Sequence, residues 1–178
     1  RASFAALSAR AGGPDPHRAT TPELAAWAHA IGLQMGAADA GDRVLLLDLL
    51  LSEVVRRAWP SGGGFVYDFP VEQAAYARIR DGDPPLASRF ELVLDGIELA
   101  NGWHEVNDVQ TQRARHAAES VARHARGLPD MPPDPGLLAA LESGLPDCAG
   151  VALGIDRLVM LACAARDLGA VLAFGAEP

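Results

Sequence analysis

An aspartate–glycine pair between two apolar runs is the feature of this sequence that most narrows its possible folds. Asp95-Gly96 separates RFELVL from IELA, and this dipeptide is a preferred centre for a two-residue type I′ turn. We therefore predict a tight antiparallel hairpin. Its register pairs Leu94 with Ile97, Val93 with Glu98, Leu92 with Leu99 and Glu91 with Ala100.

The two strands of this hairpin divide their side chains between two faces, because successive residues of a strand point in opposite directions. We expect one face to enter a core with Phe90, Leu92, Leu94, Ile97 and Leu99. The opposite face then carries Arg89, Glu91, Val93, Glu98 and Ala100. Two carboxylates, those of Glu91 and Glu98, thus share a face in a diagonal arrangement.

Strict alternation fails just beyond the second strand. Asn101, Trp103 and Glu105 can join Glu98 on one face only if the strand contains a β-bulge. Gly102 is the natural place for it, since glycine inside a strand often marks such a bulge.

Two interpretations of the carboxylate face remain open. In the first, it is a solvated face of an antiparallel sheet on which Arg89 neutralises Glu91. In the second, Glu91 and Glu98 bind Mg²⁺, which proteins usually hold with one or two carboxylates together with water and substrate phosphates. Burial of this face would favour the cation, because an unpaired buried charge costs several kcal/mol.

The rest of the chain predicts helices and strands without a regular βαβ period, which indicates an α+β fold with an antiparallel sheet. A helical segment covers about residues 1–60, and a sheet region about 65–178. We expect Thr21 to cap the first clear helix, and the helix at 42–58 to be buried on more than one side. Further elements are a strand at 65–69, helices at 108–126 and 134–142, and a strand and helix within GVALGIDRLVMLACAARDLG.

Charge and cysteine content exclude several classes of protein. The 178 residues carry a net charge of −8, which argues against nucleic acid and anionic membranes as partners. The apolar run at 44–51 is too short to span a bilayer. Cys148 and Cys163 have neither disulfide-framework nor zinc-ligand spacing, so a reducing cytoplasm fits best.

Two motifs resemble a known family. The run RFELVLDGIELANGWHEVNDVQTQR resembles the region between motifs 2 and 3 of class II lysyl-tRNA synthetases, whose pattern is RFE, a glycine turn and EIGNGFSELND. GVALGIDRLVML resembles their motif 3. The resemblance implies a class II aminoacyl-tRNA synthetase-like antiparallel sheet flanked by helices, with residues 1–178 forming the C-terminal part of the catalytic domain, downstream of motifs 1 and 2.

The chain departs from the lysyl-tRNA synthetase pattern at informative places. That pattern has glycine at Ala100, phenylalanine at Trp103, serine at His104, and PPTAGxGxGIDR where this chain reads LPDCAGVALGIDR. Ala100, His104, the LPDC run and FVYDFPVEQAA are instead similar to the paralogues that ligate (R)-β-lysine to elongation factor P. We therefore expect the chain to belong to this branch.

The resemblance also implies roles for individual residues. Glu91 and Glu98 match carboxylates that bind the metal and ATP. Arg157 matches the motif 3 arginine that contacts the ATP phosphates. The resemblance makes Arg157 and Glu98 the expected catalytic residues. Gly154 allows close approach of the nucleotide. The amino-acid pocket is made by Ala100, Asn101, Trp103 and Glu105, of which Glu105 receives the ammonium of a lysine side chain.

The implied activity is a two-step acyl transfer with ATP and Mg²⁺. Lysine or (R)-β-lysine forms an adenylate, and the acyl group passes to a lysine of elongation factor P. A homodimer is expected for the full-length protein. Two alternatives stay open: a lysyl-tRNA synthetase fragment, and an inactive truncated paralogue that acts as a binding module. The acceptor separates the first alternative from the expected activity: a lysyl-tRNA synthetase charges tRNA, whereas the expected enzyme modifies elongation factor P.

Overall fold

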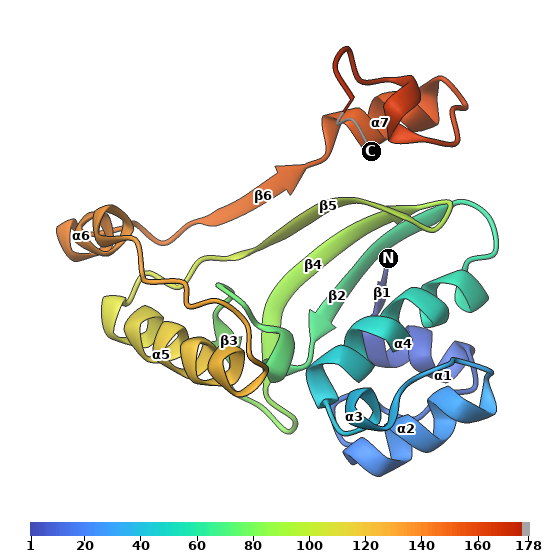
Figure 1. Ribbon diagram of the computed structural model, residues 1–178, viewed down its shortest axis with the longest axis horizontal. Helices are drawn as coiled ribbons and strands as arrows, with labels where there is room; N and C mark the ends of the chain where they lie inside the picture. Colours follow the sequence, from blue (N-terminus) through green and yellow to red (C-terminus); the bar gives the residue numbers. More distant parts are fainter. Residues whose placement is uncertain (176–178) are drawn as a thin grey trace.

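A six-stranded sheet organises the computed structural model, which describes residues 1–175 apart from the side chains of residues 37 and 38 (Figure 1). The strand order is β1-β2-β4-β5-β6, and β3 pairs with β4. The strands are β1 (Ala2–Ser3), β2 (Gly63–Phe69), β3 (Ile79–Arg80), β4 (Leu86–Leu94), β5 (Ile97–His104) and β6 (Ala149–Leu153). All pairs are antiparallel except β1 with β2, which is parallel. The predicted α+β class is confirmed, and the parallel edge pair is an addition to it.

The predicted helices are present. Four helices precede β2: α1 (Phe4–Arg10), α2 (Thr21–Ala30), α3 (Ala37–Ala40) and α4 (Arg43–Ala58). The short helices α1 and α3 are further ones, and they lie within the segment 1–60 that was predicted to be helical. Between β5 and β6 lie α5 (Val109–Ala125) and α6 (Pro135–Ser143), and β6 leads into α7 (Ile155–Ala162). Single 3₁₀ turns are η1 (Val71–Gln73) and η2 (Leu168–Ala170).

The cap of α2 is Thr20, one residue before the predicted Thr21. The Thr20 backbone N–H donates to Glu23 Oε2 at 2.7 Å, and the Glu23 backbone N–H donates to Thr20 Oγ1 at 3.4 Å. This reciprocal pair is a capping box, which requires a glutamate three residues after the cap. Only Thr20 has Glu23 at that spacing.

Helix α4 buries one broad side rather than several, so the prediction of burial on more than one side is wrong. Its buried positions repeat at helical spacing: Leu46, Leu47, Leu50, Leu51, Val54 and Val55. Val44 and Leu49, which lie off this side, are exposed. The buried positions belong to one core cluster with α1, α2 and strands β1, β2 and β4.

The helical layer covers the face of the sheet that carries the carboxylates. Val66 of β2 pairs with Glu91 of β4 and therefore shares its face, and Val66 and Val93 both belong to the core cluster. The other face was predicted to be the core, but Phe65 and Leu94 on it are exposed. That prediction is wrong. The helices pack on the face that carries the smaller apolar residues Val66 and Val93, and not on the face that carries Phe65 and Leu94.

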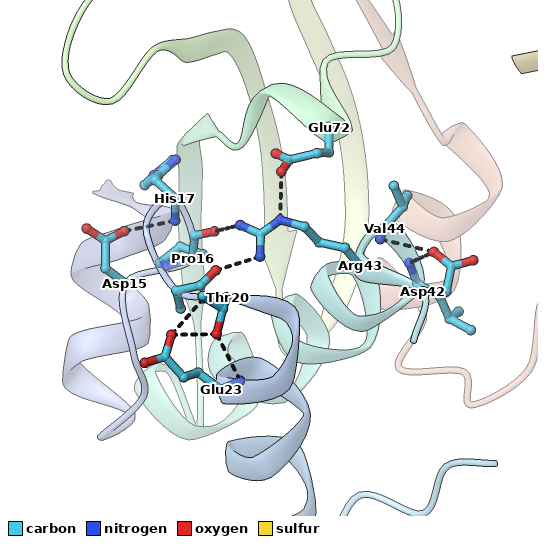
Figure 2. Close-up of polar contacts among 11 residues, drawn as sticks. Asp15, Pro16, His17, Thr20, Glu23, Asp42, Arg43, Val44 and Glu72 are labelled. Atoms are coloured by element: carbon cyan, nitrogen blue, oxygen red, sulfur yellow. Dashed lines mark hydrogen bonds and ion pairs between the residues drawn. The ribbon is translucent and has the colours of Figure 1, made fainter. Parts of the chain in front are cut away.

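Arg43 ties the helical layer to the segment that follows β2 (Figure 2). Its guanidinium donates to Glu72 Oε1 at 2.6 Å, to the carbonyl oxygen of Ala19 at 2.6 Å and to that of Pro16 at 2.9 Å. Asp42, the residue before it, caps α4 by accepting from two backbone N–H groups. The arginine thus fixes η1, and η1 leads directly to the site described below.

The part of the chain after β5 packs less densely. In Figure 1, α5 and α6 lie at one end of the sheet, and α7 lies beyond β6, apart from α1–α4. Several apolar side chains here are exposed, among them Val151, Leu153, Ile155 and Leu158. Within residues 1–175, no helix is both long and apolar enough to cross a membrane.

Candidate active site

The hairpin forms around the predicted turn. Asp95 and Gly96 both have positive φ angles, 49° and 78°, as a type I′ turn requires. Leu94 pairs with Ile97 and Val93 with Glu98, as predicted. Beyond these pairs the register shifts, so Leu92 pairs with Ala100 and Glu91 with Asn101.

The β-bulge therefore lies at Leu99 and not at Gly102. Its predicted effect is nevertheless present, since Asn101 shares a face with Glu91, and Trp103 with Arg89. Gly102 has another reason to be glycine, because a Cβ there would lie 2.6 Å from the Phe90 ring and 2.7 Å from the Gly150 carbonyl oxygen.

The bulge moves Ala100 out of the predicted site. Ala100 pairs with Leu92 and with Leu153, so its methyl group lies on the face opposite Glu91. Ala152 instead pairs with Asn101 and lies on the site's face. Sequence reasoning missed Ala152, although the GxGxG stretch of the lysyl-tRNA synthetase pattern, which has glycine at this position, was a signal for it.

Glu91 is the most enclosed carboxylate of the site, with 6% of the residue exposed. Arg89 Nη2 donates to Glu91 Oε1 at 2.7 Å, and the same guanidinium donates to the carbonyl oxygen of Gln73 and to Asn101 Oδ1. Burial, with smaller contributions from the charges of Glu98 and Asp48, raises the pKa of Glu91 to about 7, against the lowering effect of Arg89. Arg89 therefore neutralises Glu91 only in part.

Glu98 of β5 and Arg157 of α7 lie at a more open part of the site, with 43% and 46% of their side chains exposed. Arg157 Nη1 donates to the main-chain oxygen of Glu98 at 2.8 Å, and lies 4.0 Å from Glu98 Oε2. The Gly154 backbone N–H, at the start of α7, donates to the carbonyl oxygen of Leu99. A Cβ at Gly154 would make only ordinary contacts, so the chain's own packing does not demand glycine there.

The residues present fit a divalent cation with two protein carboxylates. Glu91 and Glu98 share a face and repel each other enough to affect the pKa of Glu91. A cation would remove this repulsion, and Mg²⁺ completes its coordination with water and phosphate oxygens. Within the described residues no group of three or more His, Cys, Asp or Glu side chains could hold a metal by itself.

The other end of the site is built around Glu105. Trp103 Nε1 donates to Glu105 Oε2 at 2.6 Å. Glycine at position 150 leaves room for this carboxylate, since a Cβ there would lie 2.5 Å from Glu105 Oε1. The Tyr76 ring lies against Trp103, with centroids 6.0 Å apart. An aromatic wall and a carboxylate are therefore adjacent, an arrangement that can bind an aliphatic chain ending in an ammonium group.

Arg115 of α5 fixes the segment that carries Tyr76. Its Nη1 donates to the carbonyl oxygens of Ala75 and Ala77 at 2.7 Å each. Ala75 has a positive φ of 48°, which costs energy in a residue other than glycine. The two hydrogen bonds hold this strained turn. The β-bridge between Ala77 and Glu105 then connects the turn to the site.

A family model for class II tRNA synthetases (D, K and N) matches residues 50–178. The chain belongs to the class II tRNA synthetase family. This match contains every predicted site residue, from Glu91 to Arg157. The class II synthetase fold is therefore confirmed for the greater part of the chain.

Within this class II family, the chain is similar to proteins named elongation factor P–(R)-β-lysine ligase. It is 47% identical over 161 residues to that of Klebsiella pneumoniae (strain 342), covering 90% of this chain and 50% of the relative. The Vibrio cholerae protein is 48% identical over 156 residues, covering 85% and 47%. The Salmonella dublin protein is 46% identical over 161 residues, covering 90% and 50%. The chain spans about half the length of the curated relatives it matches.

Proposed function

We propose that the complete protein containing this chain activates lysine or (R)-β-lysine as an adenylate and transfers it to a lysine of elongation factor P. The observation that carries the proposal is the single sheet face on which Glu91, Glu98 and Asn101 lie with Trp103 and Glu105 at one end. The names of the similar proteins support the choice of substrates. We further propose that the protein works in a reducing cytoplasm and that the complete protein is a homodimer. The free state of Cys148 and Cys163 is in keeping with a reducing environment.

The nucleotide end of the site is assigned to Glu91, Glu98 and Arg157. Glu91 and Glu98 would hold Mg²⁺, and the ion would supply positive charge that stabilises the leaving pyrophosphate. Arg157 lies at the start of α7, where a guanidinium and a helix N-terminus both favour phosphate. In this assignment Arg157 exchanges its contact with Glu98 for a contact with the nucleotide.

The amino-acid end is assigned to Asn101, Trp103 and Glu105. The Glu105 carboxylate accepts from the terminal ammonium of the substrate, and the Trp103 ring contacts the aliphatic chain. Because Trp103 Nε1 already donates to Glu105 Oε2, the carboxylate is oriented before the substrate binds. Such pre-organisation lowers the entropy lost on binding.

Both chemical steps proceed without an enzyme nucleophile. A carboxylate oxygen of the amino acid attacks the α-phosphorus of ATP, and the bond from that phosphorus to the pyrophosphate oxygen breaks. The lysine amine of the acceptor then attacks the acyl carbon, the bond to the AMP oxygen breaks, and the nitrogen loses a proton. The site's residues therefore orient the reactants and stabilise developing charge.

Charging of tRNA is the second candidate, because the matching family model describes tRNA synthetases. The two candidates share the first step and differ only in the acceptor. An inactive binding module is the third. It predicts ligand binding, if any, without pyrophosphate exchange.

The experiment that tests the proposal has two stages with the complete protein. We expect pyrophosphate exchange into ATP that depends on lysine or (R)-β-lysine, followed by transfer of labelled amino acid to elongation factor P. Transfer to lysine tRNA instead would favour the second candidate. No exchange with either amino acid, in a folded protein, would contradict the proposed activity.

A further inference from the structure

We propose that His104, Asp147 and Arg78 form a polar network that positions Glu105 for the terminal ammonium of the amino-acid substrate. These are positioning residues, because they act through Glu105 and not on the substrate. The inference rests on the proposed function, to which it adds the residues that set amino-acid affinity.

The carboxylate of Asp147 is the centre of the network. Its Oδ1 lies 2.5 Å from His104 Nε2 and 2.9 Å from Arg78 Nη2. The hydrogen bond with His104, together with the charge of Arg78, lowers the pKa of Asp147. Asp147 is therefore ionised at neutral pH and holds both partners. It lies two residues before β6, and His104 is the last residue of β5.

Arg78 connects this carboxylate to the backbone of Glu105. Its Nε donates to the Glu105 main-chain oxygen at 2.7 Å while its Nη2 contacts Asp147. The Glu105 backbone N–H in turn donates to the Cys148 carbonyl oxygen at 3.0 Å. Arg78, Glu105, Cys148 and Asp147 thus close a ring of contacts around the ends of β5 and β6.

This ring determines where the Glu105 carboxylate can lie. Glu105 Oε1 lies over Gly150 of β6, and Oε2 accepts from Trp103 Nε1. The carboxylate is thus placed between the two strands. Since β6 is the last strand in the order of the described sheet, its ladder with β5 and this ring fix its position at that end.

A role in positioning explains the network better than a role in stability. The side chains of Arg78, His104 and Asp147 are 31%, 38% and 71% exposed. Ion pairs at such exposure contribute little to folding. His104 and Asp147 also stand where the lysyl-tRNA synthetase pattern has serine and proline, so the two departures from that pattern contact each other. We infer that they work as a pair.

Substitution in the complete protein tests this role through pyrophosphate exchange. We expect Asp147→Ala and His104→Ala each to raise KM for the amino acid about tenfold, with KM for ATP unchanged, because Glu105 contacts only the amino acid. His104→Gln keeps an N–H donor and should remain close to wild type. The double alanine variant should be no worse than either single one. Asp130→Asn, on the linker between α5 and α6, is the control, since Asp130 contacts Ser120 and no residue of the network.

A second readout does not depend on activity. The Trp103 indole N–H resonance, assigned with Trp103→Phe, reports the position of the Glu105 carboxylate, because the two groups are hydrogen-bonded. We expect Asp147→Ala to shift this resonance and Asp130→Asn to leave it in place. If the resonance shifts but the wild type shows no exchange, the network survives and the proposed function fails. An unshifted resonance, or an unchanged KM in an active protein, would overturn the network.

Discussion

The two ends of the sheet differ in how completely they bury their apolar side chains. Helices α1, α2 and α4 close a core over β1, β2 and β4, in which Leu46, Leu47 and Val54 are fully buried. At the other end, Val151 of β6 is 62% exposed, and Met160 is the only buried residue of α7. Burial of apolar surface is the main stabilising term in folding. The first end therefore carries most of the stability of this chain.

The candidate site crosses the boundary between these two regions. Glu91 lies under the helical layer, whereas Arg157 lies on α7 at the exposed end. Glu91 is therefore held within closely packed residues, whereas the side chains of Arg157 and Glu98 are 46% and 43% exposed. The difference indicates that substitutions at the first end should affect stability, and those at the second end should affect activity.

The largest expected effect comes from two leucine truncations, one in each region. Leu50 is 2% exposed on α4, and Leu158 is 41% exposed on α7. We expect Leu50→Ala to reduce the free energy of unfolding by about 4 kcal/mol, because it removes transfer energy and leaves a cavity. Leu158→Ala should cost less than about 1 kcal/mol. Chemical denaturation measures both losses of stability. Equal losses would contradict the claim that the helical end of the sheet carries most of the stability.

A pH-dependent effect is expected at the boundary itself. The pKa of Glu91 is raised in the folded state, to about 7 from 4.5, so the folded chain holds the proton more tightly than the unfolded one. The protonated Glu91 therefore adds about 3 kcal/mol to the free energy of unfolding below about pH 4.5, and this contribution is lost as pH rises through 7.

Glu91→Gln removes this titration and should flatten the dependence of stability on pH over that range. Unfolding curves of the wild type and the variant between pH 5 and 8 measure the difference. Parallel curves would show that Glu91 ionises in the fold as easily as in the unfolded chain. Glu119→Gln, on the exposed surface of α5, is the control that should leave the dependence unchanged.

A smaller effect is expected from the arginine that joins the helical layer to η1. Arg43→Ala removes three hydrogen bonds, one of them to the carboxylate of Glu72, and should cost about 2 kcal/mol of stability. Arg56→Ala removes the ion pair of an exposed arginine with Glu53 on the same helix and should cost clearly less than Arg43→Ala. Thermal or chemical unfolding compares the two, and a larger loss for Arg56→Ala would refute the role of Arg43.

Local signals in the sequence predicted much of the fold. Asp95-Gly96 predicted the turn correctly, because a type I′ turn needs positive φ angles at both central positions, and aspartate and glycine adopt them more readily than most residues. Asp42, Asp108 and Asp134 cap helices for the same kind of local reason.

Features that depend on packing between elements were not predictable in this way. The bulge at Leu99 leaves both Leu99 and Ala100 buried, whereas Gly102 is needed for contact with Phe90 and Gly150. Both faces of the hairpin carry apolar residues, so alternation alone could not tell which one the helices cover. Ala152 lies on the site's face, where Ala100 was predicted, because the bulge at Leu99 shifts the register of β4 and β5 by one residue.

The central claim is that Glu91 and Glu98 bind the metal that holds ATP. Its most direct test is pyrophosphate exchange by Glu98→Gln in the complete protein, with folding checked by circular dichroism and Glu119→Gln as the matched control. We predict a loss of exchange of at least about 10²-fold, with the fold intact, because one charged ligand of the cation is removed. Exchange close to the wild-type rate would contradict the metal assignment.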